Sequence, residues 1–349
     1  MQLPVYLDYN ATTPHDPEVI EAMRPFLETE FGNPSSSHAY GSAPRNAVRT
    51  ARKQAADLLG CRPEEILFTS GGTESNNHAI KSAAMLCADR GRHIITSRVE
   101  HPSVLEVFGF LEKQGFEATY LEVDETGRVP VNRLASAIRS DTILISVMHA
   151  NNEVGTINPI AEIAEVARKH GILIHTDAAQ SAGKIRTEPG SLGVSLLSIA
   201  GHKLYAPKGI GALYIKDGLA LEPFCHGAGQ EGGRRAGTEN VTMIAGLGKA
   251  CETAKINLEK NAAHMQTLRG RLEKVITGEI SESRINGHPE HRLPNTSSIS
   301  FYGLEANRIL DEIKDRVAAS AGAACHADTV SVSHVMLEGM DDVSIFLNG

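Results

Sequence analysis

The sequence predicts an α/β fold built on a mostly parallel, seven-stranded sheet, and three observations support this prediction. Short apolar segments alternate with helical patterns from about residue 16 to residue 215. The apolar segments are continuous and contain many β-branched residues, as in strands that are buried on both faces of a sheet. Most of the segments between them have the periodicity of amphipathic helices. Together these features are typical of a domain in which helices cover both faces of a central sheet.

The expected strands are four to six residues long and are bounded by polar or glycine-containing turns. They are Glu65–Thr69, His93–Thr96, Ala118–Leu121, Thr142–Val147, Ile172–Thr176, Ser195–Ile199 and Gly211–Ile215. The expected helices include Pro44–Leu59, Glu74–Ala88, Ile160–Lys169 and a longer one from about Met243 to Ile276.

A chain of 349 residues is long enough for two domains. We expect residues 16–255 to form a large domain around the sheet. Residues 1–15 and 256–349 are predicted to form a smaller α+β domain.

Composition argues against several classes of partner. The formal net charge is −8, whereas nucleic-acid-binding surfaces are basic. No run of about 18 apolar residues is present, so no membrane span is expected. The N-terminus lacks the basic and apolar regions of a signal peptide. We therefore expect a cytoplasmic protein without nucleic acid or membrane partners.

The five cysteines are odd in number and include no Cys-x-x-Cys pair, which argues against a disulfide framework or a zinc site. Four of them, Cys61, Cys87, Cys225 and Cys251, are interpreted as structural. The fifth, Cys325, lies in a run of small residues that predicts a loop, where a thiolate could act as a nucleophile. A buried structural cysteine is the alternative at this position.

The segment Thr69–Asn77, Thr-Ser-Gly-Gly-Thr-Glu-Ser-Asn-Asn, follows an expected strand and opens an expected helix. Small residues let backbone N–H groups approach an anion at a helix N-terminus, and the hydroxyl of Thr73 would add a donor. The pattern therefore indicates a phosphate site, with an ordinary helix cap as the alternative.

Three further polar residues follow expected strands. Lys203 could form a Schiff base, Asp177 could hold a pyridinium nitrogen in its protonated state, and His101 could stack on a flat ring and move protons. Each has an ordinary alternative, namely a surface lysine, a turn aspartate and a structural histidine. Because the carboxyl ends of neighbouring parallel strands meet at one edge of a sheet, all three would lie near the phosphate site. A phosphorylated aromatic aldehyde would fit there.

Eight segments of the chain closely resemble the cysteine desulfurase and selenocysteine lyase family, a branch of the class V aminotransferases with the pyridoxal 5′-phosphate (PLP) fold type I. They are YLDYNATTP (6–14), GNPSSSH (32–38), FTSGGTESNN (68–77), VEHPSV (99–104), ANNEVG (150–155), HTDAAQ (175–180), GHKLYAPKGIGALY (201–214) and RAGTEN (235–240). The resemblance covers nearly the whole chain in the family's order and implies that the protein is a PLP enzyme.

The resemblance also implies residue roles. Lys203 would form the Schiff base, Asp177 would face the pyridinium nitrogen, Gln180 would bind the ring hydroxyl, and His101 would stack on the ring and transfer protons. Gly72, Thr73 and His202 would hold the phosphate. Thr238 would reach the phosphate of the neighbouring subunit in a homodimer, and Asn152 would lie near the ring hydroxyl and the substrate carboxylate. Cys325 would attack the substrate sulfur and pass a persulfide to an acceptor or scaffold protein.

The chain departs from the family pattern at two places. Many members carry a phosphate-binding serine at the position of Ala200 or Gly201, and this chain has no hydroxyl at either position. The C-terminal segment that follows Ser333–Glu338 lacks the arginine that holds the substrate carboxylate, so we expect a shortened small domain without its last strand and helix. Arg234 or Arg235 could substitute for that arginine.

The favoured function is therefore a PLP-dependent cysteine desulfurase acting on L-cysteine. A selenocysteine lyase acting on L-selenocysteine is an alternative, because the segment Cys325–Asp328 resembles those enzymes. A PLP-binding protein without turnover is a second alternative, because the arginine that holds the substrate carboxylate is missing. A metallohydrolase, suggested by the fifteen histidines and by His175 near Asp177, lacks the expected metal motifs.

Overall fold

The computed structural model describes residues 3–321, 335 and 344–348. Its centre is a seven-stranded sheet with the strand order β2-β8-β7-β6-β5-β3-β4. The strands are β2 (Ile66–Thr69), β3 (His93–Ser97), β4 (Glu117–Leu121), β5 (Thr142–Ser146), β6 (Leu173–Asp177), β7 (Leu196–Ala200) and β8 (Gly211–Ile215). Strand β8 is antiparallel to both of its neighbours, and the other neighbouring pairs are parallel. The predicted α/β fold with a mostly parallel seven-stranded sheet is confirmed.

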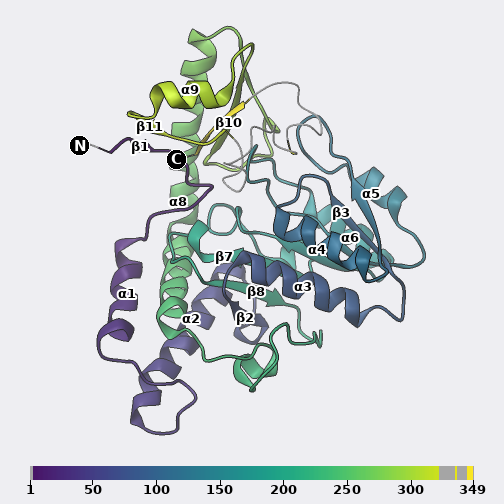
Figure 1. The fold of residues 1–349 in the computed structure, drawn as a ribbon, viewed down its shortest axis with the longest axis vertical. Coiled ribbons are helices and arrows are strands. Elements are labelled where there is room, and N and C mark those ends of the chain that lie inside the picture. The colour runs from purple at the N-terminus through teal and green to yellow at the C-terminus, as the bar shows by residue number, and fades with distance from the viewer. Residues whose placement is uncertain (1–2, 322–334, 336–343, 349) are drawn as a thin grey trace.

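Helices cover both faces of this sheet (Figure 1). Within β2, Ile66 and Phe68 belong to one apolar cluster and Leu67 belongs to the other, because successive side chains of a strand point to opposite faces. The first cluster includes residues of α1 (Pro17–Glu28), α2 (Ser42–Leu59), α5 (Val131–Ala137), α6 (Ile160–Lys169) and α8 (Val241–Glu279). The second includes residues of α3 (Gly72–Leu86) and α4 (Pro102–Lys113). A short helix, α7 (Pro189–Leu192), precedes β7.

Local sequence explains where several of these helices begin and end. Helix α1 follows Asp16, whose side chain accepts a hydrogen bond from the backbone N–H of Glu18 at 2.8 Å, and proline occupies its first turn. Helix α2 stops at Gly60, whose φ of 62° lies in the left-handed region that favours glycine. These local signals set the start of α1 and the end of α2.

Helix α8 has 39 residues and extends roughly 60 Å at 1.5 Å per residue, so it runs from the large sheet to a smaller set of elements at one end of the molecule (Figure 1). A second sheet lies there in the order β12-β10-β9. Its strands are β9 (Ser283–Ile285), β10 (Thr296–Phe301) and β12 (Ser344–Asn348), and α9 (Ala306–Ile313) follows β10 in the chain.

The N-terminal strand β1 (Val5–Tyr6) pairs in parallel with β11 (Val317–Ala318), which brings the start of the chain to this smaller part. On this basis we propose that residues 1–15 and 256–349 form the small domain and residues 16–255 the large one. The expectation that the small domain lacks its last strand is wrong for residues 344–348. They pair with β10 as an antiparallel strand, because the apolar Ile-Phe-Leu stretch has a high strand propensity.

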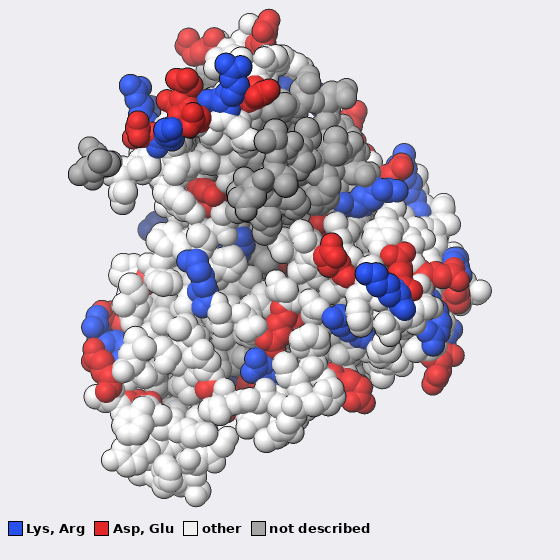
Figure 2. All heavy atoms as spheres, viewed as in Figure 1, with Lys and Arg blue, Asp and Glu red and all other residues white. Residues whose placement is uncertain are grey.

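Acidic and basic side chains are interspersed on the face shown in Figure 2, with no large patch of one sign. Within the part of the chain that the structure describes, no helix is long and apolar enough to cross a bilayer. The cytoplasmic location stays a prediction.

Candidate active site

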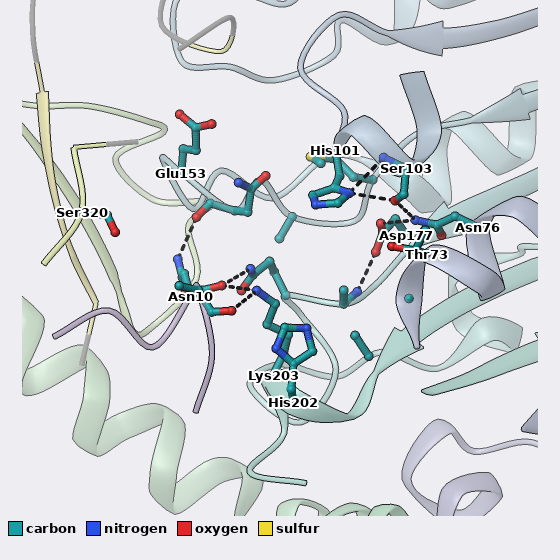
Figure 3. Close-up of a pocket in the computed structure, with 18 of the residues that line it drawn as sticks. Asn10, Thr73, Asn76, His101, Ser103, Glu153, Asp177, His202, Lys203 and Ser320 are labelled. Carbon is teal, nitrogen blue, oxygen red and sulfur yellow. Dashed lines mark hydrogen bonds between the residues drawn. The ribbon is translucent and has the colours of Figure 1, made fainter. Parts of the chain in front are cut away.

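A cavity of about 300 Å³ lies at the edge of the large sheet where the parallel strands end, and Figure 3 shows the side chains around it. Its wall is formed by segments that follow β2, β3, β5, β6 and β7, together with the N-terminal segment and Ser320 of the smaller part. Such a position is expected for a ligand site, because the loops after parallel strands converge there. The structure thus brings together the candidate residues that the sequence placed at strand ends.

Lys203 lies at the end of a 3-10 turn, η3 (Gly201–Lys203), directly after β7. Its half-buried side chain extends into the cavity, and Nζ donates hydrogen bonds to the backbone carbonyls of Asn10 and, at 2.8 Å, of Ala11. The amine is therefore held by neutral acceptors in the cavity, where it can meet a carbonyl carbon. A lysine exposed on the surface, which was the ordinary alternative, is not what the structure contains.

Asp177 is the last residue of β6, and its carboxylate is buried on the opposite side of the cavity (Figure 3). Oδ1 accepts a hydrogen bond from the N–H of Ala179 at 2.9 Å, and Oδ2 accepts one from Nδ2 of Asn76 at 2.7 Å. Two donors thus hold the buried carboxylate in one orientation. This arrangement suits a group that pairs with a protonated ring nitrogen.

His101 is the N-cap of α4, and its ring lines the cavity near Asp177 (Figure 3). Nδ1 accepts a hydrogen bond from the backbone N–H of Ser103 at 3.1 Å and lies 2.7 Å from Oγ of Ser103. The cap fixes the ring plane, because both contacts come from the first turn of the same helix. The imidazole is therefore positioned rather than free to rotate.

The residues predicted to hold phosphate also line the cavity. Gly72 and Thr73 form the first turn of α3, where N–H groups point out of the helix. A Cβ at Gly72 would come within 3.2 Å of Cβ of Ala200, so the two small residues leave room for an anion beside the helix. His202 lines the same cavity. Burial, reinforced by the charge of Lys203, lowers its pKa to about 4, so its ring is neutral at physiological pH and acts by hydrogen bonding.

Gln180 and Asn152 also line the cavity, and both are tied to the N-terminal segment through Asn10. Nε2 of Gln180 donates to the carbonyl of Asn10 at 3.0 Å, and the carbonyl of Asn152 accepts a hydrogen bond from Nδ2 of Asn10 at 2.9 Å. The Asn10 side chain also bonds Asn295 and Thr296, both at 2.9 Å. Asn10 therefore links the start of the chain, the cavity and the beginning of β10.

Sequence reasoning did not single out Asn10, Asn76 or Ser103 as site residues. All three belong to segments that resembled the family, YLDYNATTP, FTSGGTESNN and VEHPSV, so the signal was present in those segments. Their roles depend on partners that lie far away in the chain, and a segment by itself does not reveal such partners. Asp8, Glu153 and Ser320 also line the cavity, and they too were missed.

Two predicted site residues are not part of the described cavity wall. Thr238 lies on an exposed segment before α8. Cys325 lies outside the described residues. The suggestion that Arg234 or Arg235 replaces the missing arginine is not supported. Arg234 donates to the carbonyls of Glu64 and Ile66, and Arg235 pairs with Glu74 at 2.8 Å, because both lie beside β2 and the start of α3.

The residues present fit PLP. The cavity has glycine and alanine where a phosphate needs close approach, an amine that can bind an aldehyde, and a carboxylate placed to face a ring nitrogen. Among the described residues there is no group of three His, Cys, Asp or Glu side chains that could hold a metal ion. His175 is instead buried between Oγ of Ser146 and Oγ of Ser198, at 2.8 and 3.0 Å. The fold and this cavity define the protein as a PLP-dependent enzyme of fold type I.

Comparisons with known proteins identify the family. The family model of the class-V aminotransferases matches residues 5–348, so the chain belongs to that family, whose members depend on PLP. The cysteine desulfurase IscS of Dictyoglomus turgidum is 49% identical over 337 residues, which cover 96% of this chain and 86% of the relative. The cysteine desulfurase IscS of Methanosarcina thermophila is 48% identical over 333 residues, which cover 95% and 82%.

Solved structures have the same fold. A NifS-like protein superposes with a TM-score of 0.91 at 36% identity and covers 99% of this chain and 94% of its own. A structure described as SspA in complex with cysteine superposes with a TM-score of 0.87 at 37% identity, covering 99% and 98%. The expected fold type is thereby confirmed, as is the resemblance to cysteine desulfurases.

Proposed function

We propose that this protein is a PLP-dependent cysteine desulfurase that converts L-cysteine into L-alanine and leaves a persulfide on Cys325. Relatives named cysteine desulfurase that are 48–49% identical over nearly the whole chain support the substrate, as does a related structure with cysteine bound. The observation that carries the proposal is that Lys203, Asp177 and His101 surround one cavity at the sheet edge. The persulfide sulfur would be passed to an acceptor or scaffold protein.

Each side chain of the cavity has a proposed task. Lys203 would bind the cofactor covalently, Asp177 would pair with the ring nitrogen, Gln180 would donate to the ring hydroxyl oxygen, and His101 would stack on the ring. Gly72, Thr73 and His202 would bind the phosphate, and Asn152 would contact the ring hydroxyl and the substrate carboxylate. When bound, PLP supplies an electron-withdrawing ring that stabilises negative charge at the Cα of an amino acid.

The remaining steps belong to the chain's own groups. With the substrate bound in the cavity, the amine of Lys203 would take the Cα proton. The Cys325 thiolate then attacks the substrate sulfur, so an S–S bond forms and the carbon–sulfur bond breaks. The electron pair of the broken bond stays with the substrate's three-carbon fragment, which takes up two protons and leaves as alanine. One cysteine and one protein thiol thus become one alanine and one protein persulfide.

Two variants test the proposal. Lys203→Ala should abolish the visible absorbance of the bound cofactor and the formation of alanine from cysteine. Cys325→Ala should keep that absorbance but stop sulfide release in the presence of a reductant. Cys225→Ala is the matched control, because Cys225 does not line the described cavity, and it should behave like the unchanged protein. Normal turnover by Lys203→Ala would overturn the proposal.

Measuring alanine from cysteine and from selenocysteine side by side separates the desulfurase from the selenocysteine lyase. A higher kcat/KM for selenocysteine would favour the lyase. Bound cofactor with no alanine from either substrate would indicate a PLP-binding protein without turnover.

We also propose a homodimer in which Thr238 reaches the phosphate of the partner's site. Thr238 is exposed in the single chain. Phe31 and Tyr40, between α1 and α2, are 79% and 62% exposed and their ring centroids are 5.6 Å apart. The surface formed by that segment, at the lower end of Figure 2, carries few charged side chains. Exposed aromatic rings of this kind are typical of subunit contacts. Sedimentation equilibrium should give twice the monomer mass, and a monomer would contradict the proposal.

A further inference from the structure

A second lysine is buried behind the wall of the cavity. Lys184 follows β6 by seven residues and has a relative exposure of only 6%. Its Nζ donates to Oε1 of Gln180 at 3.2 Å. Within the described part of the chain, no carboxylate forms an ion pair with it, although buried ammonium groups usually have such a partner.

Burial of this amine has a clear energetic cost. Removal from water, together with the nearby charge of Lys203, lowers the pKa of Lys184 to about 7. An apolar side chain of the same length would avoid that cost, and buried charges are often replaceable in this way without loss of stability. We therefore look for a role other than stability, and the hydrogen bond of the amine to Gln180 indicates one.

The hydrogen bond fixes which end of the Gln180 amide faces the cavity. In both its charged and neutral forms, the amine of Lys184 has N–H groups to donate, and Oε1 is the only acceptor atom of the amide. The other atom, Nε2, is then directed toward the N-terminal segment, where it donates to the carbonyl of Asn10. With the amide rotated by half a turn, Nε2 would face the amine of Lys184 and Oε1 would face a carbonyl oxygen.

We infer that Lys184 is a positioning residue, which holds Gln180 so that an N–H of its amide, and not its oxygen, faces the ring hydroxyl of bound PLP. Nε2 carries two hydrogens, and the carbonyl of Asn10 takes one of them. The second hydrogen serves the ring oxygen, which carries negative charge and accepts hydrogen bonds. This inference rests on the proposed place of Gln180 beside the ring.

A double-mutant cycle tests the inference on cofactor binding, without measuring turnover. Lys184→Met keeps the length of the side chain and removes the donor. It should weaken PLP binding by about tenfold, as expected for a lost hydrogen bond to a charged oxygen. In a Gln180→Ala background the same change should have an effect of less than about twofold, because the residue through which Lys184 acts is gone. Lys216→Met, at an exposed lysine after β8, is the matched control. It should leave the affinity for PLP unchanged in both backgrounds.

A spectroscopic measurement adds a readout that a loss of packing would not change. Loss of an N–H donor to the ring oxygen should raise the pH midpoint of the visible absorbance change, in Gln180→Ala and in Lys184→Met alike. Lys184→Gln, which keeps an N–H donor, should shift the midpoint less than Lys184→Met. Thermal unfolding followed by circular dichroism would show that the variants are folded. Should Lys184→Met unfold, Lys184→Leu, which also lacks a donor, takes its place in the cycle.

The outcomes separate the two proposals. Equal effects of Lys184→Met with and without Gln180 would overturn the positioning role and leave the site proposal intact. If Gln180→Ala changed neither affinity nor midpoint, the place of Gln180 beside the ring would be wrong, and the role of Lys184 would fall with it.

Discussion

Asn76 of α3 and Asp177 of β6 are 101 residues apart in the chain, yet Nδ2 of the amide donates to Oδ2 of the carboxylate at 2.7 Å. The same Nδ2 donates to Oγ of Ser103 at 2.8 Å, and that hydroxyl lies 2.7 Å from Nδ1 of His101 (Figure 3). Because the hydroxyl accepts from Asn76, its hydrogen is available to Nδ1, which also accepts the N–H of Ser103. In the neutral imidazole the proton is therefore on Nε2. One hydrogen-bonded chain joins two of the groups that are proposed to contact the cofactor ring.

The first prediction concerns this chain of hydrogen bonds. Asn76→Ala removes a donor from a buried carboxylate, and a hydrogen bond to a charged group contributes about 1.5–3 kcal/mol. We expect kcat/KM for cysteine to fall by roughly 10- to 150-fold while the fold is retained. Asn77→Ala on the same helix is the control, because the amide of Asn77 bonds the carbonyl of Thr73 and not the carboxylate. Equal losses in both variants would contradict a specific role for Asn76.

The second prediction concerns Ala200, which is the last residue of β7 and lines the cavity beside Gly72. Ala200→Ser adds a hydroxyl where many family members are expected to have one. A hydrogen bond of about 1.5 kcal/mol to a charged phosphate oxygen should tighten PLP binding by roughly tenfold, measured by fluorescence titration of the apoenzyme. Ala200→Gly lacks the hydroxyl and should give no gain. Unchanged affinity in Ala200→Ser would place the phosphate elsewhere.

The third prediction concerns residues 226–240, a glycine-rich segment that carries Thr238. Glu231 in this segment is buried, and its two oxygens accept from the two terminal nitrogens of Arg52 at 2.6 and 2.8 Å. Glu231 also accepts the N–H of Phe68 at 3.1 Å. Removing one partner of a buried pair costs about 3–5 kcal/mol, so Glu231→Ala should lower the free energy of unfolding by that order.

Glu259→Ala is the control for this measurement. Its ion pair with Arg186 has both side chains 77% exposed, so its removal should leave the urea midpoint unchanged. A similar loss of stability in both variants would contradict the special role of the buried pair.

The fourth prediction concerns Glu100, which precedes His101 and is fully buried. Burial raises the pKa of its carboxyl from 4.5 to about 8, although hydrogen bonds from Ser97 and from the N–H of Met148 act in the opposite direction. Between these two pH values the folded state holds a proton that the unfolded state has lost. The contribution of Glu100 to stability is therefore full below about pH 4.5 and is lost as the pH rises to about 8.

Urea unfolding at a series of pH values checks this prediction. Between these pH values, Glu100 should make the free energy of unfolding decline by at most about 1.4 kcal/mol per pH unit. Glu100→Gln should remove this decline. Glu106→Gln, at an exposed position of α4, should keep the decline of the unchanged protein. An identical pH dependence in Glu100→Gln and the unchanged protein would show that Glu100 is ionised in the fold.

Much of the large domain was predictable from local sequence. All seven strands of the large sheet lie within two residues of their expected bounds, and α6 has the bounds expected of it. Apolar runs and helical periodicity are properties of short segments, so they can be read without knowledge of the fold. The last strand of the smaller part was missed, because the expectation relied on an absent family motif. Pairing with β10 instead forms that strand.

The sequence by itself determined the chemical groups of the site and their positions at strand ends, because parallel strands bring their carboxyl ends to one edge. It thereby determined Lys203, Asp177, His101 and the small residues around Gly72. Only the tertiary structure decided how those groups are held. Side-chain directions in the packed chain determine three contacts, namely those of Asn10 with β10, of Asn76 with Asp177 and of Lys184 with the cavity wall. The first two contacts join residues more than 100 positions apart. No local pattern encodes the two long-range contacts, since they form only when separate elements pack together.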